Sequence, residues 1–138
     1  MDFSEKRLTV ESLHVTLGLG IFYLTLIRLI YKTFNPTPAL QNSIFIGQKI
    51  IAKLNHIFLY VAILTITISG ALKKLYNGEE LDMFFFNFEI KDNFELAEIF
   101  YEIHIISNYT LIILITLHIF AVIVHKVLFK ENLLKRIL

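Results

Sequence analysis

The sequence predicts an all-α integral membrane protein, a helical bundle with three transmembrane helices in a single domain over residues 1–138. Composition is the first observation behind this prediction: 56% of the residues are apolar and the mean hydropathy is +0.65, far from an ordinary soluble domain. The second is the presence of three long apolar stretches, which place the spans at about 10–32, 50–73 and 100–129.

Each stretch is long enough for a helix that crosses lipid, which takes about 20 mainly apolar residues. Residues 12–27 contain no Asp, Glu, Lys or Arg, and neither do residues 54–72. Residues 103–125 form the longest run and contain no Gly or Pro. The alternative is a soluble bundle with buried helices, but three such runs would leave too little polar surface to cover them. Helices are expected because lipid offers backbone groups no partner.

Charge predicts the orientation of the spans. The segment from Arg28 to Lys53 has four basic residues and no acidic one, and residues 126–138 have four basic residues against Glu131 alone. Residues 73–102 have three lysines and eight acids, a count of −5. Basic segments next to spans face the cytoplasm, so we expect an outer N-terminus and a cytoplasmic C-terminus.

Two histidines of the third span indicate metal centres. His104 and His118 are 14 residues apart, so they leave one helix face roughly 21 Å apart along its axis. That separation fits two centres stacked across hydrocarbon about 30 Å thick. An imidazole in hydrocarbon needs a partner, and a buried metal is suitable. The sequence therefore predicts a transmembrane b-type haem protein.

The first and third spans run in the same direction, and His14 and His104 lie in their opening turns. These two imidazoles are expected at the same outer depth, as the two ligands of one haem. Gly18 follows one turn after His14, where a missing side chain admits a flat macrocycle. Close helix packing is an equally good interpretation of Gly18 and of nearby Gly20.

His118 lies deeper and indicates a second, inner centre, for which the sequence leaves the opposite ligand open. His56, at the start of the second span, has roughly the right depth. His125 emerges at the inner interface, either as a snorkelling residue or as a partner of a quinone headgroup or a proton relay.

The sequence does not support other kinds of functional site. The chain has no cysteine, which excludes disulfides, thiolate metal sites and covalently attached c-type haem. We find no nucleophile–base arrangement, phosphate loop or nucleic-acid surface. The aromatic residues Phe84–Phe88 are expected to fold over the outer helix ends as an apolar lid, or to rest on the membrane interface.

The chain resembles the bacterial cytochrome b561 family, which includes membrane superoxide oxidases. The resemblance covers nearly the whole chain in order, and the fourteen-residue histidine spacing followed by a third histidine seven residues later is its specific part. The matching segments are Leu13–Gly18, Leu29–Leu40 (LIYKTFNPTPAL), Leu54–Tyr60, Ser69–Gly70, Phe84–Phe88, Tyr101–His104 and Leu117–Lys130 (LHIFAVIVHKVLFK).

The resemblance implies a four-helix bundle with two bis-histidine b haems in the bacterial inner membrane. His14 and His104 would ligate the outer haem, and His118 would be one ligand of the inner haem. His125 would lie near a quinone site, whereas His56 matches a recurrent histidine not usually counted as an iron ligand.

The family has a further helix before the segment matched here, and it supplies the other inner-haem ligand. One haem b site is therefore complete and the second lacks a ligand. A truncated sequence would explain this, since residues 2–13 are interpreted as an outer loop. Another chain could supply the missing helix, or a true three-helix protein could hold one haem or use His56 for the inner iron.

The resemblance implies electron transfer across the lipid bilayer, from superoxide outside to quinone inside. An electron-transfer subunit that anchors a partner redox enzyme is the alternative, and a haem-free protein that handles divalent metal or protons is a third. The acidic outer connection would repel superoxide and suits a basic electron-donor protein, although Lys73 and Lys74 could create a local positive field.

Overall fold

The structure, a computed structural model, describes residues 3–35 and 46–128 of the chain. It confirms the all-helical fold with three helices: α1 (Phe3–Phe34), α2 (Ile46–Tyr76) and α3 (Phe94–Leu128). Each contains a stretch long and apolar enough to cross a membrane, at Ser4–Phe34, Ile50–Tyr76 and Phe94–Val124. The three predicted spans are therefore confirmed as candidate membrane helices.

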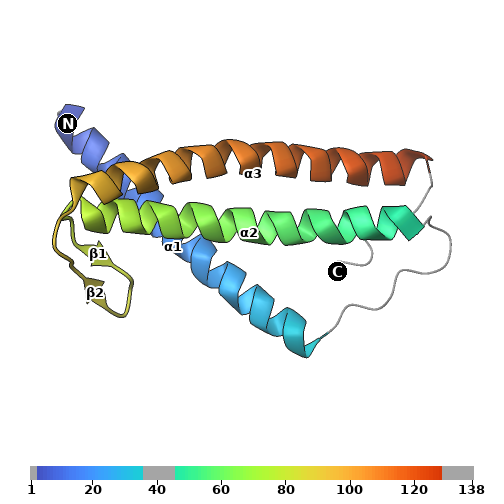
Figure 1. Cartoon of the computed structure of the whole chain (residues 1–138), viewed down its shortest axis with the longest axis horizontal. Coiled ribbons are helices and arrows are strands. Elements are labelled where there is room, and N and C mark those ends of the chain that lie inside the picture. Colours follow the sequence, from blue (N-terminus) through green and yellow to red (C-terminus); the bar gives the residue numbers. More distant parts are fainter. Residues whose placement is uncertain (1–2, 36–45, 129–138) are drawn as a thin grey trace.

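Helices α2 and α3 lie side by side and antiparallel, and α1 crosses α2 obliquely (Figure 1). The packing of α2 against α3 is more extensive than its packing against α1. Small side chains allow this approach: Ala62, Ser69 and Ala97 are all buried. Most large apolar side chains point outward, as they do in a protein whose solvent is lipid.

All three helices begin before the predicted spans, α1 and α3 by the most residues. The interpretation of residues 2–13 as an outer loop is wrong for residues 3–13, which belong to α1. This segment is rich in good helix formers, and Glu5 in the first turn complements the helix dipole. Helix α3 begins at Phe94 because the Asn93 side chain caps it, accepting a 3.1 Å hydrogen bond from the backbone N–H of Leu96.

A short β-hairpin connects α2 to α3. Its strands β1 (Leu81–Asp82) and β2 (Asn87–Phe88) pair antiparallel, and they lie beside α1 and α2 at one end of the bundle (Figure 1). Leu81 is 1% exposed and packs with Leu19 of α1 and Leu75 of α2. The Tyr23 hydroxyl donates a 3.0 Å hydrogen bond to the backbone carbonyl of Met83.

The phenylalanines of this hairpin do not form a lid over the helix ends. The side chains of Phe84, Phe85 and Phe86 are 53%, 79% and 68% exposed. The rings of Phe84 and Phe85 contact the Tyr23 ring, with centroids 6.1 Å and 6.4 Å away. The reason is that Leu81, rather than these rings, fills the space between α1 and α2. The exposed rings favour the other interpretation, an apolar segment on the membrane interface.

Candidate haem sites

The structure brings the imidazole rings of His14 of α1 and His104 of α3 close together in an edge-to-face arrangement. Their ring centroids are 6.1 Å apart, and the ring planes are nearly perpendicular at 81°. The two residues are 90 positions apart in sequence, so this pairing depends on α1 and α3 running in the same direction against α2. The side chain of His14 is exposed, whereas that of His104 is half-buried against α2.

The His104 ring is held by the backbone of α2. Its Nδ1 lies 2.8 Å from the carbonyl oxygen of Ile66, and because a carbonyl only accepts, Nδ1 carries the proton. The other ring nitrogen, Nε2, is then unprotonated and free to bind a metal.

Gly70 makes this hydrogen bond possible. A Cβ atom at position 70 would lie 2.9 Å from Cε1 and 3.0 Å from Nδ1 of His104, closer than real Cβ contacts allow. The ring therefore occupies the space that any side chain at this position would take. In the sequence, Gly70 belongs only to a segment that resembles the family, and no pattern points to Ile66.

The His14–His104 pair fits the axial ligands of a haem. Two imidazole nitrogens, each about 2 Å from one iron, place the ring centres roughly 6 Å apart. A haem supplies its own four equatorial nitrogens, so it needs only two protein ligands. Among the described residues no group of three or more His, Cys, Asp or Glu could hold a bare metal ion.

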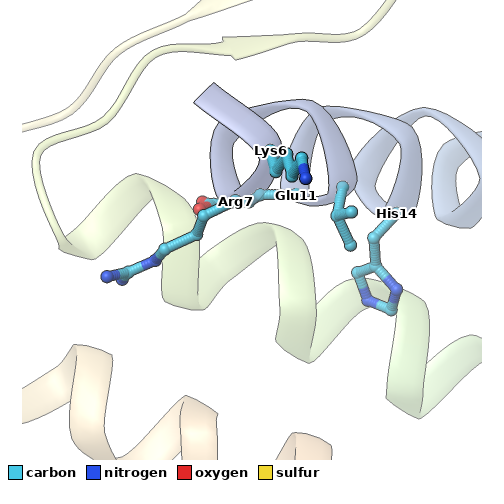
Figure 2. Close-up of a pocket in the computed structure, with 5 residues that line it drawn as sticks. Lys6, Arg7, Glu11 and His14 are labelled. Atoms are coloured by element: carbon cyan, nitrogen blue, oxygen red, sulfur yellow. The ribbon is translucent and has the colours of Figure 1, made fainter. Parts of the chain in front are cut away.

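The flank of α1 beside His14 is open. A Cβ built on Gly18 meets nothing within 4 Å. Toward the N-terminus of α1, an open hollow of about 480 Å³ is lined by Lys6, Arg7, Val10, Glu11 and His14. Figure 2 shows the side chains of Arg7 and His14 leaving α1 on the same side of the helix. Within the described part of the chain, Arg7 makes no ion pair.

A second histidine pair lies further along α2 and α3. The rings of His56 and His118 have centroids 5.1 Å apart and planes at 60°. This separation is shorter than an iron between two imidazoles requires, so it favours His56 as a neighbour of His118 over His56 as its partner ligand. His56 thus lies at the depth of His118, as the sequence predicted.

His118 has another contact that the sequence did not predict. The amide nitrogen Nδ2 of Asn55 lies 2.9 Å from Nδ1 of His118. The presence of Asn55 inside an apolar span could have indicated such a contact, because a polar side chain in lipid needs a partner. His125 lies in the last turns of α3, and its side chain is outside those that the structure describes.

The acidic connection is exposed in the structure. All eight of its acidic side chains are exposed, from Glu79 to Glu102. The two nearby lysines are engaged: Nζ of Lys74 pairs with Glu79 at 2.6 Å, and Nζ of Lys73 lies 5.8 Å from the Tyr101 ring centroid. The ion pair offsets the positive charge of Lys74, whereas the neutral Tyr101 ring leaves the charge of Lys73 in place.

Three membrane-length helices and an opposed histidine pair define the class of membrane-embedded b-type cytochromes. The profile of the family described as prokaryotic cytochrome b561 matches residues 1–138, so the chain belongs to this family. Members of this family are membrane proteins that bind haem b. The chain is accordingly a multi-pass membrane cytochrome that functions in transmembrane electron transfer. No curated protein matches the chain.

Proposed function

We propose that the chain binds haem b between His14 and His104 and passes electrons from superoxide at the outer face to quinone at the inner face. The geometry of this pair carries the proposal: the rings are 6.1 Å apart, and the bond from His104 to Ile66 leaves Nε2 available. When bound, the haem supplies reversible one-electron chemistry. Two superoxide ions give two molecules of oxygen, and one quinone takes the two electrons with two protons.

The residues around the pair have separate tasks in this proposal. Ile66 fixes the tautomer and direction of the His104 ring, and Gly70 leaves room for it. Gly18 lies one turn from His14 on the same face of α1, and leaves space for the macrocycle. Two imidazoles bound to the iron would leave no open coordination position, so oxygen would not bind to it directly.

Arg7 is proposed to bind a haem propionate. It precedes His14 by seven residues, which places it on nearly the same helix face and roughly 10 Å closer to the membrane surface. Its guanidinium group has no ion-pair partner in the described residues, and both residues line one hollow. Glu11 in the same lining limits the net positive charge there.

His118 is proposed to ligate a second, inner haem whose other ligand comes from a helix outside this structure, supplied by the same or another chain. His56 beside it and His125 are proposed to lie near the quinone. In this proposal the protein lies in the bacterial inner membrane, and α3 ends at the cytoplasmic face. The C-terminus is therefore cytoplasmic.

Haem content and spectra of single histidine variants test the main proposal. The purified protein should show a reduced b-type spectrum, and His14→Ala and His104→Ala should each remove the same component. A His118→Ala variant should retain that component. Full pigment in either of the first two variants would contradict the proposal.

A second candidate function is an electron-transfer subunit that docks a basic donor protein. One observation favours it: the eight acids of residues 79–102 are all exposed, in the α2–α3 connection and in the part of α3 that precedes His104, while Lys74 is already paired. Such a surface attracts a cationic protein and repels an anionic substrate. Rapid reduction of the purified protein by a superoxide pulse would argue for the first function and against this one.

A further inference from the structure

We propose that Asn55 is a positioning residue for His118. Its side-chain amide holds the Nδ1 edge of the His118 ring and leaves Nε2 to bind iron when the amide oxygen faces Nδ1. This inference rests on the proposed role of His118 as an inner-haem ligand. Its basis is the 2.9 Å contact between Nδ2 of Asn55 and Nδ1 of His118, which joins α2 to α3 across 63 positions of sequence.

The contact has a defined polarity. An amide nitrogen only donates, so in the structure Nδ1 of His118 accepts the hydrogen bond and the ring proton is on Nε2. In this tautomer, Nε2 has no free lone pair for a metal. Rotation of the Asn55 amide by half a turn places Oδ1 against Nδ1 instead. Nδ1 then carries the proton and donates, and Nε2 is free to bind.

The two haem-binding histidines therefore differ in how they are held. The partner of His104 is the Ile66 carbonyl, which accepts only, so Nε2 of His104 is free at all times. The partner of His118 is the Asn55 amide, which can either donate or accept. The ring nitrogen of His118 that carries the proton can therefore differ between the haem-free and the haem-bound protein. We expect the amide of Asn55 to turn over when the haem binds.

The surroundings of Asn55 support a specific role. Its side chain is half-buried between α2 and α3, whereas the neighbouring His56 is exposed. A polar amide in the membrane-spanning part of a helix is costly when it is unpaired, and His118 is the partner that the structure gives it. His56 touches the same ring edge-on, so the His118 imidazole is confined by two consecutive residues of α2.

A hydrogen bond accepted from Nδ1 increases the basicity of the ligand, and a more basic imidazole stabilises ferric over ferrous iron. Removal of the amide should therefore raise the midpoint potential of the haem bound to His118. Because Asn55 lies eleven residues before Ile66, the residue of α2 that contacts His104, the potential of the other haem should stay constant.

The experiment uses the haem-loaded protein as purified from membranes, with any partner chain retained, in phospholipid nanodiscs. It measures midpoint potentials and low-temperature electron paramagnetic resonance spectra. His118→Ala first identifies the spectral component of the inner haem, which should disappear. Asn55→Leu should raise the midpoint of that component and broaden its resonance. Asn55→Asp, which keeps an acceptor, should restore the wild-type midpoint or lower it. Asn35→Leu is the control, since the side-chain amide of Asn35, directly after α1, donates to the Tyr31 carbonyl at the end of that helix and does not contact a histidine in the described part of the chain.

The outcomes separate this inference from the function on which it rests. An inner-haem midpoint that is unchanged in both Asn55 variants, while His118→Ala removes the component, would overturn the role of Asn55 alone. A His118→Ala variant with all components intact would overturn the inner-haem proposal as well. If Asn55→Leu does not fold, the midpoint of Asn55→Asp decides, because aspartate preserves the size of the side chain and an acceptor oxygen for Nδ1.

Discussion

The Nδ1 atom of His104 and the carbonyl oxygen of Ile66 are 2.8 Å apart, across the interface between α3 and α2. This hydrogen bond fixes a free Nε2 on the imidazole before any haem arrives. It exists because residue 70, one turn after Ile66, has no side chain. The orientation of the His104 imidazole thus depends on three residues, of which only His104 is a proposed haem ligand.

Substitution of Gly70 by alanine should displace the His104 ring and lower the affinity for the outer haem. The added Cβ lies 2.9 Å from the ring, and overpacking of this kind costs about 1–3 kcal/mol. A helix gains at most about 1 kcal/mol from Gly→Ala, which does not offset it. Haem titration followed by absorbance should show roughly tenfold weaker binding. Gly47→Ala is the control, since its Cβ meets nothing within 4 Å.

Leucine at position 18 should block haem without disturbing the helices. The space beside Gly18 is empty in the structure, so the side chain fits the haem-free protein but occupies the proposed place of the macrocycle. Haem per polypeptide should fall several-fold, while far-ultraviolet circular dichroism stays constant. Gly47→Leu, in a similarly open position, should keep its haem. Equal haem in both variants would contradict this use of Gly18.

Loss of the positive charge at Arg7 should weaken haem binding modestly. An ion pair near the surface contributes up to about 1 kcal/mol, so Arg7→Gln should bind haem roughly three- to fivefold more weakly at low salt. The difference from wild type should shrink as salt is added, because the pair is partly screened. Lys53→Gln removes an exposed charge of α2 and should have no effect. A haem affinity of Arg7→Gln equal to wild type would exclude the propionate contact.

The Tyr23 hydroxyl should stabilise the hairpin without affecting the haem. Tyr23→Phe removes the 3.0 Å hydrogen bond to Met83 and should cost about 1 kcal/mol. Hydrogen exchange of residues 81–90 should become faster by roughly a factor of five, as this free energy implies. The haem spectrum should match that of the wild type. Unchanged exchange in the hairpin would show that Leu81 alone secures it.

The acidic surface distinguishes the two candidate functions kinetically. Replacement of Glu80 and Glu89 by glutamine removes two exposed negative charges. Reduction by superoxide should then become faster, most clearly at low ionic strength, because an anion is repelled less. Reduction by a small basic redox protein should become slower. The sign of the rate change for each donor, measured by stopped flow, is the readout.

Much of the fold follows from hydrophobicity alone. Runs of apolar residues near His14, His56 and His104 give the three helices, because lipid accepts a backbone only when its own hydrogen bonds are satisfied. The helix beginnings were less predictable. The cap at Asn93 and the helix-forming residues from Phe3 depend on local bonds, which composition does not reveal.

The candidate ligands were also visible in the sequence, because helical periodicity and the direction of each span place His14 and His104 at one depth. Only the tertiary structure decided what surrounds them. A backbone carbonyl of α2 and the missing side chain of Gly70 orient one imidazole, and the amide of Asn55 contacts another. These contacts depend on how closely and at what rotation α2 packs against α3, and periodicity along a single helix contains no information about either.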